Sequence, residues 1–323
     1  MELCANQPLY IKQIIAEEEI RVYRVLTLLY HRINDLIYDK NLLAVTPDNF
    51  YKQMSYLKEK YRIVRFEEDW NNLDENAVCI TFDDGYMDNF TNALPILSEL
   101  QIPATIFIST GNINTNIEFW WDELERILLE RGKKYNDSFV LQDEMFSCQW
   151  PTESLEERVE LYDTLHWLMY DKISVEKRKN WIKQLQKWSN SGNEGRTKNQ
   201  AIQMDKIDLE SPLLTIGAHT VNHPSLKNLS EQEQYYEIYQ SIRELQVLFK
   251  RDITVFSYPF GSKNDFDNIT IDICKDVNIK KAAANYPGIW KQGCDEYQIP
   301  RNIVRNWSID KYIQKIEEFW KIG

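Results

Sequence analysis

Val78-Cys79-Ile80-Thr81-Phe82-Asp83-Asp84-Gly85 is the stretch that decides how this chain of 323 residues is interpreted. A run of apolar, strand-forming residues ends abruptly at two adjacent carboxylates and a glycine. This pattern is typical of a buried strand that carries reactive groups to the rim of a sheet or barrel. Because successive strand residues point to opposite faces, both carboxylates serve one site only if the chain turns at Gly85. The alternative interpretation is an Asp-Asp-Gly turn that caps the next helix.

The composition indicates a globular chain with a full hydrophobic core. Of its residues, 43% are apolar and 13% aromatic, and its length suits one large barrel or two ordinary domains. The formal net charge of −12 argues against a nucleic-acid partner and against docking on an anionic membrane. Five scattered cysteines without CxxC spacing indicate neither a disulfide framework nor a thiolate metal site.

The sequence also bears on the compartment in which the protein works. Residues 1–19 lack the apolar core of a signal peptide, and no stretch is long enough to span a bilayer. We therefore expect a cytoplasmic protein with reduced cysteines. The sequence carries no signal for the oligomeric state.

Strands and helices alternate along much of the chain. We predict strands at residues 22–30, 61–66, 78–82 and 104–108 and, after a break, at 213–218, 253–258, 281–284 and 299–304. Helices are predicted after the cap Thr46-Pro47, at about 88–100, from the capping box at Ser230 to about 250, near 269–277 and from 310 onward. This alternation with short links is typical of a parallel α/β sheet or barrel.

The alternation breaks between residues 111 and 210. Apolar residues at helical spacing predict amphipathic helices around 155–165 and 175–188, and the Ser-, Asn- and Gly-rich residues 189–199 predict a loop. We interpret residues 112–210 as a helical insertion in a strand-to-helix loop of a single domain that spans residues 1–323.

Two histidines follow the predicted strand at 213–218. His219 and His223 are four residues apart, so they share a face in a helical turn, and Pro224 limits that turn to the end of the strand. The chain has only four histidines. Two histidines at the spacing of metal ligands are therefore less easily explained by chance than they would be in a histidine-rich chain. With a carboxylate from another strand end, they predict a divalent metal site suited to zinc, cobalt, nickel or iron.

These motifs resemble those of a known family. Thr81-Phe82-Asp83-Asp84-Gly85 together with His219-Thr220-x-x-His223 resembles the first two motifs of the polysaccharide deacetylases, carbohydrate esterase family 4 with its NodB-type domain. Tyr258-Pro259-Phe260-Gly261 resembles the third. The resemblance covers the strands on both sides of the insertion. It implies a distorted (β/α) barrel of seven or eight strands that uses a divalent metal to remove N- or O-acetyl groups from sugars.

The resemblance also implies roles for individual residues. Asp84, His219 and His223 resemble the metal ligands, and Asp83 resembles the general base that takes a proton from the attacking water. The backbone N–H of Phe260 is the expected donor to the tetrahedral oxyanion. Zinc is the expected metal, with cobalt, nickel or iron as alternatives.

Four more residues are candidates for contact with the sugar: Tyr258, Pro259, Trp120 and Trp121. The first two belong to the third motif. The tryptophan pair lies nearest the predicted barrel mouth, where an indole can stack on a sugar ring. The other interpretation is that tryptophans of the insertion fill its own core, which we favour for Trp167, Trp181 and Trp188.

Two positions depart from the family pattern. The third motif usually carries an arginine that tethers the base, where this chain has Ser257; Arg301 is the candidate replacement, and a surface arginine is the alternative. The usual C-terminal histidine acid is absent, because no histidine follows His223. Some family members are circularly permuted, and His31 at the end of an N-terminal strand fits that arrangement. We therefore expect His31 to be the general acid, with a half-buried structural histidine as the alternative.

Three functions compete. The leading hypothesis is a metal-dependent hydrolase that removes an acetyl group from an N-acetylated sugar of a surface polysaccharide or of its nucleotide- or lipid-linked precursor. The second is a carbohydrate-binding pseudoenzyme that has lost turnover with the missing arginine and histidine. The third is a magnesium phosphatase, which is disfavoured because Gly85 stands where an Asp-x-Asp motif needs its second aspartate.

Overall fold

The computed structural model describes residues 23–130, 132–135, 137–144, 146–207 and 211–322. The segment that we compared with a signal peptide, and the first residue of the strand predicted at 22–30, lie outside these residues. Within the described ranges, no helix is both long and apolar enough to cross a membrane.

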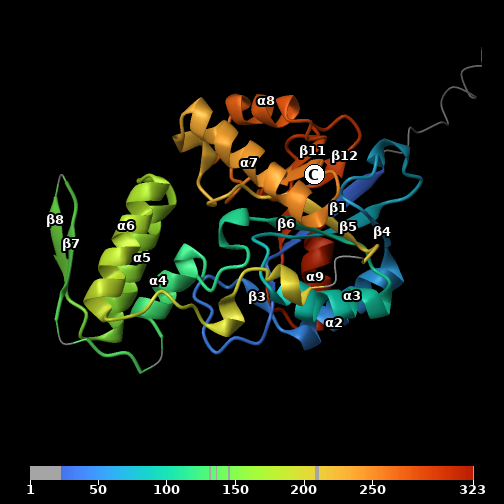
Figure 1. Ribbon diagram of the computed structural model, residues 1–323. Helices are drawn as coiled ribbons and strands as arrows, with labels where there is room; N and C mark the ends of the chain where they lie inside the picture. Colours follow the sequence, from blue (N-terminus) through green and yellow to red (C-terminus); the bar gives the residue numbers. More distant parts are fainter. Residues whose placement is uncertain (1–22, 131, 136, 145, 208–210, 323) are drawn as a thin grey trace, which may run out of the picture.

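A curled, mostly parallel sheet forms the centre of the fold (Figure 1). Six of its strands follow one another in parallel, in the spatial order β11 (Lys281–Ala283), β10 (Val255–Ser257), β9 (Leu214–Ala218), β6 (Ala104–Ile108), β5 (Ala77–Phe82) and β1 (Arg24–Tyr30). Two short strands join at the side, β4 (Arg62–Val64) in parallel to β5 and β12 (Trp290–Lys291) antiparallel to β1. Parallel strands of this kind end at a common edge, which is where side chains from different strands can meet.

Residues 299–303 connect the two ends of this sheet. Ile299 forms a parallel bridge with Ala283 of β11, and β13 (Asn302–Ile303) pairs in parallel with β1. The six parallel strands and β13 therefore make seven strands around a distorted, barrel-like sheet. The predicted α/β fold with a curled parallel sheet is confirmed.

Among the described residues, five helices belong to the barrel part of the chain. They are α2 (Pro47–Lys60), α3 (Leu94–Leu100), α7 (Glu231–Phe249), α8 (Asn268–Asp276) and α9 (Ile309–Phe319). Thr46 accepts from the Asn49 N–H at the start of α2, and Ser230 with Glu233 forms a capping box at the start of α7, as the sequence predicts. The apolar faces of these helices pack with the strands into one large core.

Short elements complete the barrel part. β2 (Arg32–Ile33) and β3 (Ala44–Val45) form a small parallel pair. Single turns of 3₁₀ helix lie at Trp70–Asn72 and Leu226–Asn228, and a π-helical turn at Asn89–Ala93 precedes α3; three more 3₁₀ turns, at Thr110–Asn112, Thr197–Asn199 and Met204–Lys206, lie between β6 and β9.

The chain between β6 and β9 carries a separate group of elements. Figure 1 shows α4 (Trp120–Leu128), α5 (Leu155–Asp171), α6 (Val175–Ser189) and the antiparallel hairpin of β7 (Phe139–Gln142) and β8 (Ser147–Trp150) on one side of the barrel. These elements pack around a core of their own. Trp181 is buried in it and Trp188 packs at its edge, but Trp167 is 56% exposed, which corrects the core role that we expected for it. The division into one domain with an insertion at 112–210 stays a prediction.

Candidate metal centre and catalytic site

Asp83 and Asp84 follow β5 at a tight turn. Asp84 has a φ of 72° and Gly85 a φ of 82°, so the left-handed conformation begins one residue earlier than the sequence suggests. A Cβ atom at Gly85 would lie 2.8 Å from Ile108 Cγ2. Glycine is therefore required here by both the backbone angle and the close approach of β6.

His219 and His223 reach the same place from the loop after β9. This loop is not the helical turn that we predicted, because Thr220 has a φ of 65° and His223 a φ of 52°. Each such residue costs about 1–3 kcal/mol and persists only where its surroundings fix it. The His223 N–H donates to Thr220 Oγ1 over 3.0 Å, and the two imidazole centroids lie 4.8 Å apart. The histidines thus meet through left-handed backbone and not through helical spacing.

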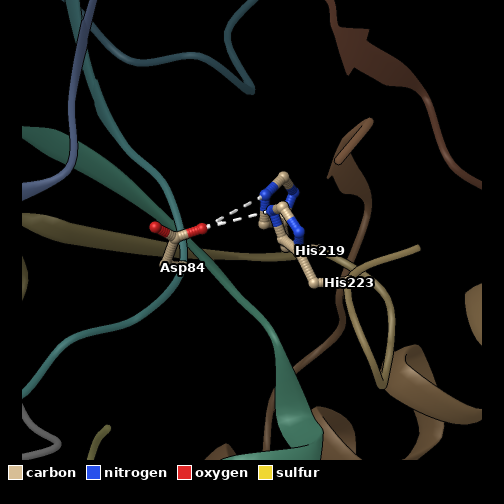
Figure 2. Close-up of side chains that lie close together, drawn as sticks. All are labelled: Asp84, His219 and His223. Atoms are coloured by element: carbon tan, nitrogen blue, oxygen red, sulfur yellow. Dashed lines mark ion pairs between the residues drawn. The ribbon is translucent and has the colours of Figure 1, made fainter. Parts of the chain in front are cut away.

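Asp84, His219 and His223 form a candidate metal centre (Figure 2). Asp84 Oδ1 lies 3.6 Å from His219 Nε2 and 3.4 Å from His223 Nε2. All three residues are buried, and their ligand atoms lie within 4.8 Å of one another. Tetrahedral zinc holds its nitrogen and oxygen ligands at about 2.0–2.2 Å, which places them about 3.4 Å from one another. The donor types and their spacing fit a divalent metal ion.

The protonation of the two histidines also fits a metal. Burial lowers the pKa of His219 to about 4 and that of His223 to about 3, so both rings are neutral at neutral pH. The Ser257 carbonyl oxygen lies 2.7 Å from His219 Nδ1. Because a carbonyl only accepts, the proton of His219 lies on Nδ1 and leaves the Nε2 lone pair facing Asp84.

Arg301 forms a bidentate ion pair with Asp83. Its Nη1 and Nη2 atoms each lie 2.7 Å from a carboxylate oxygen, and Nη2 also donates to Ser257 Oγ over 2.8 Å. Arg301 is 1% exposed, so it is not the surface arginine that we left as the alternative. Burial raises the pKa of Asp83, but the charges of Arg301 and His219 outweigh it and hold the pKa below its usual value. Asp83 is therefore an ionised carboxylate at neutral pH.

The neighbouring Asp84 is shifted in the opposite direction. Burial raises its pKa, and the charge of Asp83 adds to that effect, although His31 and His219 oppose it. Two adjacent carboxylates with opposite shifts are typical of groups with different roles. Asp84 has no arginine partner comparable to Arg301 within the described ranges, and a cation at the candidate metal centre would favour its ionised form.

A cavity of about 340 Å³ opens onto these groups. All four histidines of the chain line it, namely His31, His166, His219 and His223. Asp83 and Asp84 lie in its wall, and Trp121, His166 and Tyr170 reach it from α4 and α5. The cavity therefore combines the strand ends of the barrel with the helices that lie beside it.

His31 lies next to the carboxylates because of the strand register. Tyr30 pairs with Phe82 between β1 and β5, and the Asp83 N–H donates to the Tyr30 carbonyl over 3.0 Å. His31 directly follows β1, Asp83 directly follows β5, and both residues line the cavity. Burial lowers the pKa of His31, while Asp84 and Asp83 oppose that shift. His31 thus occupies a position from which a proton can reach a bound substrate.

Of the first three residues of the third motif, Phe260 lines the cavity, whereas Tyr258 and Pro259 lie in the core. Phe260 lines the cavity with a φ of 59°, and its N–H donates no hydrogen bond to any part of the chain that the structure describes. Tyr258 instead stacks on Phe266 at 4.0 Å and donates through its hydroxyl to the Tyr297 carbonyl. Tyr258 and Pro259 are buried and do not line the cavity. Their predicted contact with the sugar is therefore corrected to a role in packing.

The two adjacent tryptophans face different spaces. Trp121 lines the cavity of about 340 Å³ beside Asp83 and Asp84, here named the catalytic cavity. Its ring lies 4.8 Å from that of His223, and its Nε1 donates to Tyr86 Oη over 2.8 Å. Trp120 lines a neighbouring cavity of about 350 Å³ and packs on His166 at 5.0 Å. Only Trp121 of this pair is placed for contact with a ligand in the catalytic cavity.

Several lining residues were not predicted. Arg305, Asn285 and Asp265 come from loops without a recognisable motif, so the sequence offers no signal for them. His166 and Tyr170 do have a signal, since with Tyr162 they repeat every fourth residue on one face of α5. Buried Asp265 accepts from Tyr170 Oη over 2.6 Å and so connects α5 to the barrel.

Comparison with known proteins assigns the segments that carry Asp83, Asp84, His219 and His223 to a protein family. The model of the polysaccharide deacetylase family matches residues 71–134 and 193–282. Over 100 residues the chain is 29% identical to the poly-β-1,6-N-acetyl-D-glucosamine N-deacetylase of Escherichia coli O157:H7. That alignment covers 29% of this chain and only 15% of the relative.

Solved structures support the fold. The deacetylase PplD of Streptococcus pyogenes, in complex with acetate, has a TM-score of 0.54 at 20% identity, with 91% of this chain and 98% of that chain covered. IcaB from Ammonifex degensii has a TM-score of 0.53 at 17% identity, over 92% and 97% of the two chains. A polysaccharide deacetylase from Bacillus cereus has a TM-score of 0.53 at 17% identity, over 91% and 69%. The family model shows that this chain belongs to the polysaccharide deacetylase family, and the solved structures share its fold.

Proposed function

We propose that the protein is a metal-dependent N-deacetylase that hydrolyses the acetamido group of an N-acetylated sugar, within a polysaccharide or its nucleotide- or lipid-linked precursor. One observation carries this proposal. An ionised aspartate held by a buried arginine lies beside an Asp-His-His cluster, and both open into the same cavity. A base next to a site for a Lewis acid is the arrangement that amide hydrolysis by water requires.

Asp84, His219 and His223 would hold the metal, with zinc as the proposed ion. When bound, a divalent ion supplies a Lewis acid that acidifies water and polarises a carbonyl. The buried carboxylate and the two neutral imidazoles offer the lone pairs for it, and the Ser257 carbonyl fixes the orientation of the His219 ring.

Asp83 acts as the general base for the attacking water. The two hydrogen bonds from Arg301 fix the direction in which the carboxylate faces, and the arginine charge keeps it ionised. A carboxylate whose pKa is held low is a weak base, so its contribution comes mainly from position. Arg301 is therefore a positioning residue. It lies directly before β13 and takes the place of the arginine that the third motif lacks.

Collapse of the tetrahedral intermediate needs a proton on the leaving amine. His31 lines the cavity beside both carboxylates and is the proposed donor. The free N–H of Phe260 is the proposed donor to the oxyanion, because it lines the same cavity and is not used within the described residues. We keep the circularly permuted arrangement, with the acid on an N-terminal strand, as part of this proposal.

The pseudoenzyme hypothesis rested on two missing side chains. Arg301 contacts the carboxylate that the missing arginine would hold, and His31 lines the cavity where the missing histidine would act. Both positions are thus occupied by residues of the expected chemistry. This favours an active enzyme over a binding protein that has lost turnover.

The first test is acetate release from β-1,6-linked N-acetylglucosamine oligomers, the class of glycan named for the matched relative from E. coli. We expect the zinc-loaded wild type to release acetate and Asp83→Asn to release at least 100-fold less while keeping its metal. N-acetylglucosamine in other linkages and on a nucleotide carrier would then define the substrate. No release from any of these by metal-loaded protein would contradict the proposed function.

A further inference from the structure

His166 lies in the catalytic cavity but has no part in the mechanism above. It is on α5, and it is one of the residues that line the cavity together with His31 and the metal-ligand histidines. His166 is half-buried, lines the cavity, and makes no hydrogen bond through its ring nitrogens to the described residues. Its polar edge is therefore available to a ligand.

The ring of His166 is held by its neighbours. It stacks on Tyr162 at a centroid distance of 5.6 Å and packs against Trp120 at 5.0 Å. Burial lowers its pKa to about 4, so the ring is neutral at neutral pH. A neutral imidazole has one donor and one acceptor nitrogen, which suits a hydroxyl or an amide better than a charged group.

The other two members of the same helix face are already satisfied. The hydroxyl of Tyr162 donates to Asn41 Oδ1 over 3.1 Å, and that of Tyr170 donates to Asp265 Oδ1 over 2.6 Å. His166 lies between them at a spacing of four residues and lacks such a bond. These contacts fix this face of α5 and leave His166 as the member of the three without a hydrogen bond among the described residues.

A metal-binding role for His166 is disfavoured by its surroundings. The cluster of possible metal ligands in the described residues comprises Asp84, His219 and His223 without His166. The carboxylate that influences its pKa, Asp163, lies in an ion pair with Lys40 at 3.0 Å. The side chains packed on the His166 ring are aromatic, and aromatic rings with a few polar groups are common in the walls of ligand sites.

We propose that His166 is a specificity-determining residue that hydrogen-bonds a hydroxyl or acetamido group of the glycan bound in the catalytic cavity. The inference rests on the proposed function for the identity of the ligand, and it adds the helices beside the barrel to the substrate-binding surface. His166 contacts the glycan through its ring edge, while Tyr162 and Trp120 hold the ring in place.

The test separates binding from turnover. Affinity for a pentamer of β-1,6-linked N-acetylglucosamine is measured by calorimetry in the zinc-loaded Asp83→Asn background, where the glycan stays intact. His166→Phe keeps the aromatic packing and removes both nitrogens, so we expect about tenfold weaker binding, the value of one net hydrogen bond. His166→Gln restores a donor and an acceptor and is expected to recover most of the affinity.

Trp167→Ala is the matched control, because the neighbouring side chain is exposed on the same helix. In the Asp83→Asn background, Trp167→Ala is expected to bind the pentamer as tightly as Asp83→Asn alone, which is the parent of both variants. In the otherwise wild-type enzyme, His166→Phe raises KM with kcat within twofold and with unchanged zinc content. A loss confined to kcat, a loss of zinc, or unchanged glycan affinity in His166→Phe would each overturn the inference.

The outcome also distinguishes this inference from the proposed function. If His166→Phe weakens binding of the pentamer in the Asp83→Asn parent but the wild type releases no acetate, the proposed activity alone is contradicted. If the wild type releases acetate but His166→Phe and its parent bind the pentamer equally well, the role of His166 alone is contradicted. A parent that binds no pentamer contradicts the role of His166 for this glycan.

Discussion

Arg301 holds Asp83 through two hydrogen bonds of 2.7 Å, although the two residues are 218 positions apart in the chain. The contact is possible because residues 299–303 lie between β11 and β1 and bring Arg301 against the end of β5. Ser257 Oγ accepts from Arg301 and donates to Asp83 over 3.2 Å. The closure of the barrel and the position of Asp83, the proposed base, therefore depend on the same short segment.

Removing the charge of Arg301 tests this dependence. In Arg301→Gln, burial of Asp83 is no longer outweighed, so its pKa rises and the acidic limb of the profile of kcat/KM against pH moves to higher pH. A buried carboxylate without its partner also costs about 3–5 kcal/mol of stability. Arg305→Gln is the control, since Arg305 lines the cavity without contact to Asp83. An unshifted acidic limb in a folded Arg301→Gln would contradict this role.

The two adjacent carboxylates are expected to differ in metal binding. Asp84→Ala removes one of three ligands and should lower zinc affinity by at least 100-fold, whereas Asp83→Asn should bind zinc nearly as well as the wild type. Elemental analysis after dialysis against a chelator of known affinity measures both. Equal loss of zinc in the two variants would show that the roles of Asp83 and Asp84 are assigned wrongly.

His31→Ala is expected to keep the metal and lose most of its turnover. His31 lines the cavity beside Asp83 but is not part of the Asp-His-His cluster. The loss of a general acid typically lowers kcat by about 100- to 10,000-fold, and the zinc content should not change. Steady-state kinetics on the same oligomer provide the measurement. A kcat near that of the wild type would reject His31 as the proton donor.

The loop that carries the metal-ligand histidines is held from two sides. Glu237 of α7 accepts from the N–H groups of Val221 and Asn222 over 2.9 and 2.8 Å. Buried Arg178 of α6 donates to the carbonyl oxygen of Asn222. These contacts stabilise the left-handed residues of the loop, so a helix beside the barrel supports the candidate metal centre.

We expect Arg178→Ala to weaken zinc binding about tenfold without touching the metal, because the His223 backbone gains freedom. The Co²⁺ absorption spectrum of the variant should also change. Lys183→Ala, which removes an exposed cation from the same helix, is the control and should bind zinc like the wild type. Unaltered zinc affinity in Arg178→Ala would mean that Glu237 and Thr220 suffice to hold the loop.

The sequence predicts the parts of the site that follow from strand ends. The apolar run before Asp83 predicts β5, and the histidines after 213–218 predict ligands at the end of β9. Parallel strands end at a common edge, so the meeting of these groups follows from the fold class. The cluster of Asp84, His219 and His223 could therefore be anticipated from two short motifs.

Other parts could not be predicted for physical reasons. The left-handed Thr220 and His223 have no sequence signal, because such angles in residues other than glycine are imposed by tertiary contacts. The burial of Tyr258 depends on Phe266, which comes from the loop before α8. The position of α5 against the cavity also cannot be predicted from sequence, because it depends on tertiary packing. For that reason the sequence assigns His166 no role.

The most direct test of the account is a zinc titration of the metal-free wild type, with acetate release from the β-1,6-linked pentamer followed at each addition. We predict that activity is absent without metal, rises in proportion to added zinc and reaches its plateau at one equivalent per chain. His223→Ala should remain inactive throughout. Full acetate release by the metal-free protein, or no dependence on zinc in a protein that binds it, would contradict a metal-dependent deacetylase.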